Sequence, residues 1–290
     1  MQALAQAMIA GLLMGGIYAL VSVGIALIVG VVELVNFAQA DYLMVSMYIS
    51  FLAWTVFGLD PYLAFPINLA IMTVLGLITF YGVMRRVLGA NPEIRMLATL
   101  AIGMIFQNLA LILFQADFRN VTTPYSSSTF ELAGIIFNVP RTIAFFVALI
   151  VAFGLYLFLH KTFTGTSMRA ISQNNKAAKL MGIKLTRTYA LAFTMGISVC
   201  AFAGALIIPF NPAFPTVGGI FLLPAFVVVT IGGLSNVGGA IVAGLLVGVV
   251  ESSTAFLLGT QFQQVAYFVL FLIVVLLKPD GILSRKREGV

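Results

Sequence analysis

TYALAFTMGISVCAFAGALIIPFNPAFPTVGGIFLLPAFVVVTIGGLSNVGGAIVAGLLVGVV, residues 188–250, contains no Lys, Arg, Asp or Glu. A stretch of this length can cross the hydrocarbon core of a bilayer more than once, because one helical crossing needs about 20 apolar residues. Residues 1–32, 42–59 and 142–159 are also free of charge. The sequence therefore predicts an all-α protein, a polytopic bundle of transmembrane helices.

The composition excludes a soluble globular protein. Of the 290 residues, 61% are hydrophobic and 8% are charged, against about 45–50% and about 25% in soluble domains. The basic residues sit in a few loop clusters, so we expect a lipid bilayer around the chain and no nucleic acid bound to it. The single cysteine, Cys200, excludes an internal disulfide.

The positions of Lys and Arg predict which ends of the helices face the cytoplasm. Basic residues cluster at 85–95, at 161–187 and in the tail 278–287, whereas the loop at Asp60 and the loop 117–141 are balanced or acidic. By the positive-inside rule, the three clusters are cytoplasmic and the two loops are external. Residues 1–32 lack the basic start of a signal peptide, so we expect a retained first span. The expected spans are residues 9–30, 42–57, 61–84, 96–115, 143–160, 190–209, 239–258 and 262–277.

A further crossing depends on residues 220–231. This apolar run is short for an upright span and contains Pro224, which is typical of a short or re-entrant helix. Charge places the N-terminus outside and the C-terminal tail inside, a combination that needs an odd number of crossings. The sequence therefore favours this run as a ninth span in one domain, residues 1–290, with a cytoplasmic loop at 161–187.

No catalytic constellation is visible, so we predict no catalytic residue, no metal site and no cofactor in this chain. His160 is the only histidine, and it falls at the end of a predicted span. The phosphate-binding pattern G-x-x-x-x-G-K-[ST] is absent from the sequence. Any work on a solute would take its energy from a partner or from a gradient.

The segment 161–187 has six Lys or Arg residues and no Asp or Glu. We expect a helix here that is capped by Thr166 or Ser167 and ends at Gly182, since glycine readily takes the left-handed conformation. Small residues share one face of this helix, which suits a cytosolic partner, while the basic remainder would also suit anionic lipid headgroups. The residues expected at the docking surface are Ser167, Arg169, Ala170, Asn174, Lys176, Ala177, Ala178, Met181 and Gly182.

Polar residues within apolar stretches form a second candidate site. Glu33 and Asp41 flank a polar break after the first span, where we expect an interfacial position. Glu251 lies 14 residues into a helix expected to start near Val237, about 21 Å along it at about 1.5 Å per residue. A charge at that depth needs a partner, a cavity or an interface. The polar residues expected to line a pathway, or otherwise to bond between helices, are Tyr18, Asn36, Gln39, Asp41, Gln107, Asn108, Asn211 and Glu251.

Glycine spacing predicts close helix packing and two irregular segments. Gly244 and Gly248 are four residues apart, as are Gly11 and Gly15, and such faces let helices approach closely. The polar break at 36–41 and the glycine-rich stretch 231–240 suggest one broken helix in each half of the chain. The helix-break glycines are Gly232, Gly233, Gly238 and Gly239.

Five stretches, spread in order over nearly the whole chain, resemble the LivH-like membrane subunits of bacterial ATP-binding cassette importers for branched-chain amino acids. They are GGIYALVSVGIALIVGVVELVNFAQADYLM, ATLAIGMIFQN, RAISQNNKAAKLMGIKLTRTYALAFTMGIS, IGGLSNVGGAIVAGLLVG and LLKPDGIL.

The resemblance implies a permease subunit in a bacterial-type inner membrane. Its partners would be a second, LivM-like permease, two cytosolic ATPase subunits that bind ATP and Mg, and a periplasmic substrate-binding protein. The family's E-A-A-x-x-x-G docking pattern corresponds here to Lys176, Ala177, Ala178 and Gly182, with Lys in place of Glu. Where the family reads N-F-A-H-G followed by an acid, residues 36–41 read NFAQAD, and where it reads G-G-I-G-S-I-P-G-A, residues 232–240 read GGLSNVGGA.

Several alternatives remain open on the sequence. Related transporters carry urea, short amides or aromatic acids instead of amino acids. A gradient-driven secondary transporter would need a charged relay, for which Asp41 and Glu251 are the best pair. A ribose-type permease is disfavoured by the sparse polar residues, and a membrane-embedded enzyme by the lack of a His, Cys or carboxylate cluster.

Overall fold

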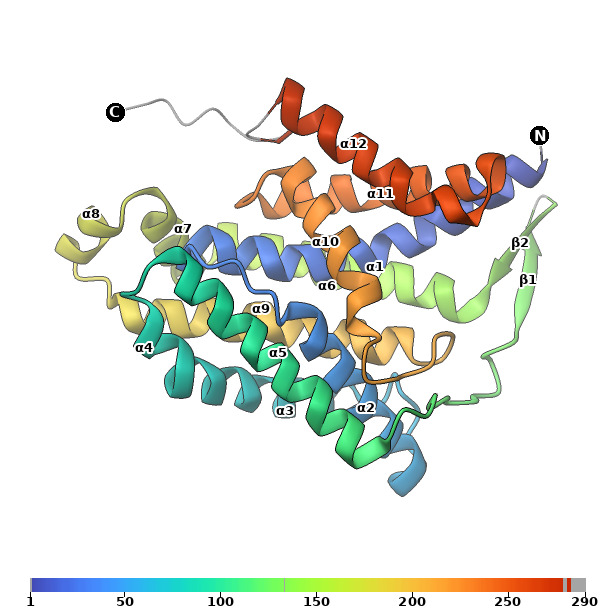
Figure 1. Cartoon of the computed structure of the whole chain (residues 1–290), viewed down its shortest axis with the longest axis horizontal. Coiled ribbons are helices and arrows are strands. Elements are labelled where there is room, and N and C mark those ends of the chain that lie inside the picture. The colour runs from blue at the N-terminus through green and yellow to red at the C-terminus, as the bar shows by residue number, and fades with distance from the viewer. Residues whose placement is uncertain (1, 133, 279–280, 283–290) are drawn as a thin grey trace.

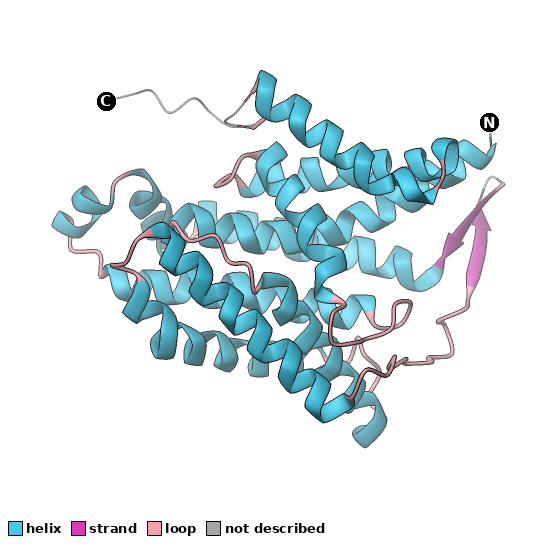
Figure 2. Ribbon diagram, viewed as in Figure 1, coloured by secondary structure: helices cyan, strands magenta, loops and turns pink. Residues whose placement is uncertain are grey.

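The computed structural model of the chain describes residues 2–132, 134–278 and 281–282. The described residues form a bundle of helices with one small hairpin (Figures 1 and 2). The helices are α1 (Gln2–Val32), α2 (Gln39–Phe57), α3 (Phe65–Thr79), α4 (Arg85–Val87), α5 (Pro92–Phe114), α6 (Val139–Lys161), α7 (Phe163–Gln173), α8 (Asn175–Leu180), α9 (Leu185–Ile207), α10 (Gly218–Gly232), α11 (Val237–Leu258) and α12 (Gln263–Leu277). The antiparallel hairpin pairs β1 (Thr129–Leu132) with β2 (Ile135–Asn138).

Eight segments in the described part of the chain are long and apolar enough to cross a membrane, as the sequence predicted. One of them joins α3 to α4 through a π-helical turn, Phe80–Met84, and another starts with the 3₁₀ turn Thr260–Phe262 ahead of α12. α1 and α9 are mostly buried, whereas α5 and α12 expose most of their apolar surface. Exposed side chains such as Ile112 and Ile150 on such helices fit a lipid solvent.

The bundle has two distinct ends. At one, which we call the hairpin end, the Gln6 side chain of α1 donates to Ile136 O of β2 and accepts from its N–H. At the other, the basic end, α7 and α8 project beyond the long helices (Figure 1). Gly30, near the end of α1, packs there against Ser235 of the α10–α11 turn. The N-terminus therefore lies at the hairpin end.

The segment before α10 and the short helix α10 together run from the hairpin end of the bundle to the basic end. In that segment Ala213 pairs with Arg119, which follows α5 at the hairpin side, through two backbone hydrogen bonds of 2.8 and 2.9 Å. At the other end of α10, Ile231 O accepts from the N–H of Ile282, just past α12. Both α10 and α12 therefore end at the basic end. This agrees with the odd number of crossings that the charge pattern predicts. The basic tail 283–290 lies outside the described residues.

Each half of the chain contains one passage through the bundle that begins with an irregular segment and continues as a helix. In the second half, this irregular segment is not where the sequence suggested. α1 is followed by residues 33–38 and then by α2, and α9 is followed by residues 208–217 and then by α10. The starts of the two short helices touch, since a Cβ on Gly218 would lie 2.7 Å from Ala40 O. The four glycines at 232–239 flank the turn between α10 and α11 instead: Gly232 ends α10, Gly233 takes φ +102° in the turn, and Gly238 and Gly239 lie in the first turn of α11.

Two hydrogen bonds show that the broken passages are arranged reciprocally. The Ser22 hydroxyl of α1 donates to Ala225 O of α10 at 3.1 Å, and the Ser46 hydroxyl of α2 donates to Ala201 O of α9 at 2.9 Å. Ser22 and Ala201 are 179 residues apart, and so are Ser46 and Ala225. This exchange of partners is the geometry of an inverted repeat.

Candidate functional site

Between α6 and α9 the basic segment forms two helices, not the single one that the sequence predicted. Thr162, not Thr166 or Ser167, caps α7, because its hydroxyl accepts from the N–H of Gly165 at 3.0 Å. Asn174 leaves the helical conformation and its carboxamide oxygen caps α8 by accepting from Ala177 N–H at 3.0 Å. Asparagine favours such a cap over a helix interior. The predicted left-handed end is confirmed, since Gly182 has φ +84°.

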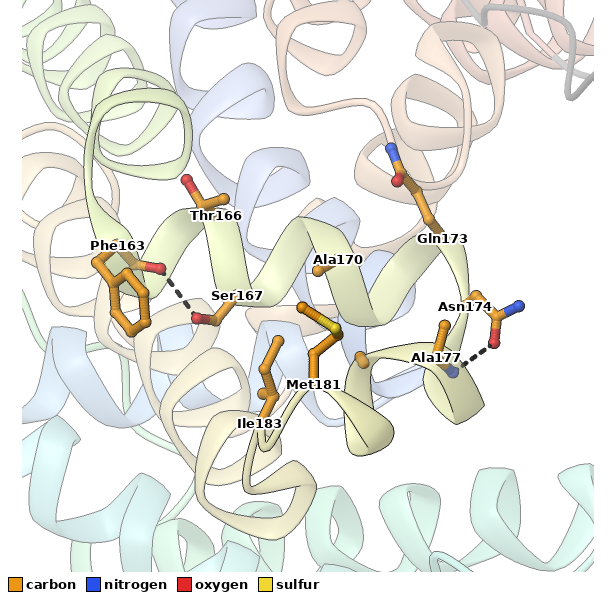
Figure 3. A pocket seen from close by; sticks show the side chains of 10 residues that line it. Phe163, Thr166, Ser167, Ala170, Gln173, Asn174, Ala177, Met181 and Ile183 are labelled. Atoms are coloured by element: carbon orange, nitrogen blue, oxygen red, sulfur yellow. Dashed lines mark hydrogen bonds between the residues drawn. The ribbon is translucent and has the colours of Figure 1, made fainter.

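A groove lies between the two helices (Figure 3). Its volume is about 420 Å³ and it is lined by Phe163, Thr166, Ser167, Ala170, Gln173, Asn174, Ala177, Ala178, Met181 and Ile183. The residues that the sequence predicted on one face of a single helix therefore line two walls of the groove, one on α7 and one on α8. Phe163, Leu180 and Met181, at this groove or beside it, are 88%, 88% and 83% exposed.

The surroundings of the groove are positively charged. Lys176 and Lys179 of α8 are exposed, and Arg169 of α7 is exposed as well but borders the cavity between α7 and α1. Within the part of the chain that the structure describes, the closest approach of opposite charges is the Arg119–Asp117 pair in the loop after α5, at 3.2 Å. The cations of α7 and α8 are therefore free to meet acidic groups on another molecule.

α7 is anchored to the bundle on its other side. Met168 and Ile171 are buried there at 0% and 1% exposure. A cavity of about 40 Å³ separates Arg169 and Ser172 of α7 from Gly30 of α1 and Ser235 of the α10–α11 turn. Elsewhere α7 contacts α1, α6 and α9 directly, so a force applied to α7 is passed to these helices.

Asn36 and Gln39 lie deep in the core and are bonded there. The Gln39 amide donates to Gly196 O of α9 at 2.8 Å and approaches the Cys200 Sγ at 3.1 Å. Asn36 donates to the Gln39 side-chain oxygen at 3.1 Å, and its own oxygen accepts from Ala38 N–H. Both side chains are at most 1% exposed. In this conformation they hold the broken start of α2 and do not line a surface.

Asp41, Gln107 and Asn108 form a second group, between α2 and α5. The Gln107 amide donates to Asp41 Oδ1 at 2.8 Å, and Asp41 is 6% exposed, deeper than the interfacial position that the sequence suggested. Gly103 of α5 leaves room for the Asp41 carboxylate, which a Cβ there would strike. Asn108 is exposed and donates only to Met104 O of its own helix, at 2.7 Å.

The remaining predicted pathway residues lie apart from these. Tyr18, 3% exposed, interacts through its hydroxyl with the half-buried Glu251 of α11, which does lie 14 residues after Val237. Asn211, in the segment before α10, is half-buried, and its amide nitrogen has no hydrogen-bond partner among the described residues. The structure thus separates the predicted residues into a core network, an α2–α5 group, a Tyr18–Glu251 pair and Asn211.

A family model described as the branched-chain amino acid transport system / permease component matches residues 7–277. The chain belongs to this family. The permease is 28% identical to the high-affinity branched-chain amino acid transport permease BraD of Pseudomonas aeruginosa, over 97% of this chain and 95% of that protein. It is also 28% identical to the probable permease LivH of Methanocaldococcus jannaschii, over 91% and 87% of the two chains. The ribose import permease RbsC of Bacillus subtilis is 32% identical over 62% of this chain and 58% of its own. No solved structure matches the chain.

The hairpin end of the permease carries a cluster that sequence reasoning missed. The Tyr125 hydroxyl lies 2.7 Å from both carboxylate oxygens of Asp60, and Asp60 also accepts from Tyr62 N–H at 2.9 Å. The rings of Tyr62 and Tyr125 stack with their centroids 5.4 Å apart. Burial and the neighbouring Asp60 carboxylate raise the pKa of Tyr125 above its ordinary value. The sequence did contain a signal for this cluster: a tyrosine, Tyr125, in the polar loop 117–141, and an acid, Asp60, in the other loop predicted on the same side.

His160 ends α6 as expected, and its Nδ1 lies 2.8 Å from Tyr156 O. Among residues 2–132, 134–278 and 281–282, no three His, Cys, Asp or Glu side chains are grouped so that they could hold a metal ion.

Proposed function

We propose that this permease is the translocation subunit of an ATP-binding cassette importer in a bacterial-type inner membrane. Its solute is a branched-chain or other hydrophobic amino acid, delivered by a periplasmic binding protein at the hairpin end. Two cytosolic ATPase subunits bind ATP and Mg and hydrolyse the ATP, and this chain contributes no catalytic residue. The family membership and the full-length likeness to BraD and LivH support this assignment.

The groove between α7 and α8 is the observation that carries the proposal. Large apolar side chains are exposed there, on a segment that projects past the long helices (Figure 1) and is basic throughout. Exposed apolar patches rimmed by polar residues mark protein interaction sites. Because α7 is also packed onto α1, α6 and α9, a partner bound here can drive movement in the bundle.

A second permease subunit would cover the face that includes α5. Asn108 lies within the apolar second half of this helix with its side chain exposed. A carboxamide facing hydrocarbon is unfavourable, whereas one that faces a protein or an aqueous path is not. Gln107 precedes Asn108 on α5 and bonds Asp41 of α2. We place the solute path along this face, between the two permeases.

The first test is co-purification. The tagged chain, isolated in mild detergent from the native membrane, is expected to bring an ATPase and a second hydrophobic subunit with it. Ala177→Arg places a charge in the groove at an exposed position and should release the ATPase but not the second permease. Asn91→Arg, exposed in the loop between α4 and α5, is the matched control and should retain both. If the wild-type chain brings no ATPase, the importer assignment is wrong and the gradient-driven alternative takes its place.

The solute is tested separately, with the reconstituted complex. ATP-dependent uptake of labelled leucine should be competed by valine and isoleucine and unaffected by urea, acetamide or ribose. Competition by urea or acetamide alone would reassign the solute and leave the importer mechanism standing. Uptake that follows an ion gradient without ATP, and stops in Glu251→Gln, would support the secondary transporter.

A further inference from the structure

Asp41 is a buried acid without a basic partner. It is 6% exposed, and its Oδ1 accepts a hydrogen bond from the Gln107 amide at 2.8 Å. Among the residues that the structure describes, no Lys, Arg or His side chain forms an ion pair with this carboxylate. A charge removed from water needs an opposite charge or several hydrogen bonds to compensate it. The single amide donor leaves most of that need unmet.

Asp41 lies near the middle of the membrane. Its Oδ2 faces Gly103 of α5, whose missing side chain leaves room for the carboxylate. Gly103 is the central residue of α5, eleven residues from Pro92 and eleven from Phe114, which is about 16 Å from either end at about 1.5 Å per residue. The hydrocarbon core is about 30 Å thick. In transporters built from inverted repeats, solute sites lie near this depth, where discontinuous helices meet.

Two helices, α5 and α10, border the start of α2 where Asp41 lies (Figure 1). The first turn of α10 approaches closely, since a Cβ on Gly218 would lie 3.2 Å from Asp41 N. Phe37, just before α2, contacts both helices: its N–H donates to Thr99 Oγ1 of α5 at 3.2 Å, and its ring centroid is 5.1 Å from that of Phe226 of α10. Both phenylalanines are half-buried. Partly exposed aromatic rings therefore border the same region as the acid.

A primary ammonium group is the cation that fits these surroundings. It carries one positive charge and three N–H donors, so it can bond a carboxylate that has one neutral donor already. An α-amino acid carries this group next to its apolar side chain, whereas urea, short amides, aromatic acids and ribose have no ammonium. The half-buried Gln107 connects Asp41 to the exposed face of α5, along which we placed the solute path.

We propose that Asp41 binds the ammonium group of the solute as the solute passes between α5 and α10, and thereby restricts transport to amino acids. The inference rests on the proposed function, because it takes an amino acid as the solute. It adds the residue that recognises one of the solute's two charges. A sodium ion or a proton could also neutralise this carboxylate, and a requirement of uptake for either ion would reveal it.

The uptake test removes the charge of Asp41 and keeps its shape. Asp41→Asn can still accept from the Gln107 amide, so the complex should keep the wild-type thermal midpoint. With a saturating amount of loaded binding protein, the leucine imported per ATP hydrolysed should fall about tenfold or more. Asp41→Glu keeps the charge and should retain part of the uptake. Asp117→Asn, which removes an exposed carboxylate just after α5, is the matched control and should retain all of it.

Wild-type uptake in Asp41→Asn would overturn the proposal, because asparagine suffices if the group only accepts a bond from Gln107. The wild-type complex should also import leucine equally well when choline replaces sodium and when a protonophore is added. Dependence of this uptake on sodium or on a proton gradient would assign the Asp41 charge to that ion and refute the ammonium site.

Binding is measured without ATP or binding protein, by saturation-transfer NMR of small ligands added to the complex in nanodiscs. Leucine and leucinamide both carry the ammonium and should give a stronger signal than isocaproate, which has the same apolar chain without it. In Asp41→Asn, this difference should disappear. Equal leucine and isocaproate signals in the wild-type complex would refute the ammonium site. Absence of ATP-dependent leucine uptake by the wild-type complex would instead refute the proposed function, and the NMR comparison would still decide whether Asp41 binds an ammonium.

Discussion

Replacing Gly248 with alanine should separate α1 from α11. Gly248 has no side chain because α1 passes directly over it, and a Cβ would lie 2.6 Å from both the Cα and the N of Gly15. Gly11 O would be nearer still, and ordinary van der Waals contact begins at 3.4 Å, so the two backbones would have to move apart by at least about 0.8 Å. Both sides of this contact are backbone and cannot rotate away. Transmembrane helices associate largely through such packing, so the lost contact has no hydrophobic compensation from water.

The expected cost is that of an overpacked core, about 1–3 kcal/mol. In a chain of this size, that corresponds to a thermal midpoint lower by about 2–6 °C. The single Cys200 provides the assay, because it is fully buried and free. A thiol-reactive dye will label it only as the bundle opens, so the labelling curve reports unfolding directly.

Gly154→Ala is the matched control. It makes the same substitution in the transmembrane helix α6, where a Cβ would have no atom within 4 Å. Alanine should stabilise the helix there by up to about 1 kcal/mol relative to glycine. If Gly248→Ala unfolds at the wild-type temperature, or if Gly154→Ala unfolds first, the argument from close α1–α11 packing is wrong.

Three further predictions follow from the polar contacts. Gln39→Leu removes the hydrogen bond to Gly196 O at 2.8 Å and strands the buried Asn36 amide, which donates to the Gln39 side-chain oxygen at 3.1 Å, so the Cys200 labelling midpoint should fall by the equivalent of about 1–3 kcal/mol; an unchanged midpoint would show that the core network is dispensable. Tyr125 has a raised pKa when bound to Asp60, so above pH 10 the detached phenol loses its proton more readily than the bound one, and attachment of the loop that carries Tyr125 should weaken as pH rises. The protection factors of residues 121–128, which are corrected for the base-catalysed intrinsic exchange rate, should therefore fall at high pH, and a Tyr125→Phe chain whose protection factors fall equally would contradict this cause. Asn108→Leu should leave the midpoint intact and reduce recovery of the second permease, with Ile112→Leu as the control on the same helix; full recovery would place the partner elsewhere.

Apolar length and charge were sufficient to predict the main architecture. The eight long spans, the projecting basic segment, the left-handed Gly182 and the depth of Glu251 all follow from properties of single residues or of short runs. The break in the second half was misplaced because glycine richness was taken as its sign. The segment before α10 is instead interrupted by Pro209, Pro212 and Pro215, none of which can donate a backbone hydrogen bond.

Features that depend on hydrogen bonds between particular residues of the chain could not be predicted in the same way. The periodicity of residues 166–182 fits one helix, and only the bond from Ala177 N–H to the Asn174 side chain shows that it breaks into two. Asn36 and Gln39 are ordinary pathway candidates by residue type. Their bonds to each other and to Gly196, 157 residues after Gln39, assign them to the core. Such pairings depend on how distant segments meet, which residue type and spacing do not specify.

The shortness of α10 has a consequence for biosynthesis. Its 15 residues are fewer than the about 20 that allow a helix to cross the hydrocarbon core alone. Its first turn begins within the bundle, beside Ala40 of α2, where lipid could not satisfy the exposed N–H groups. Ser22 of α1, which bonds Ala225 O, is synthesised some 200 residues earlier. The N-terminal half therefore serves as the template for insertion of α10, which is retained in the membrane only after docking onto a segment that has already left the ribosome.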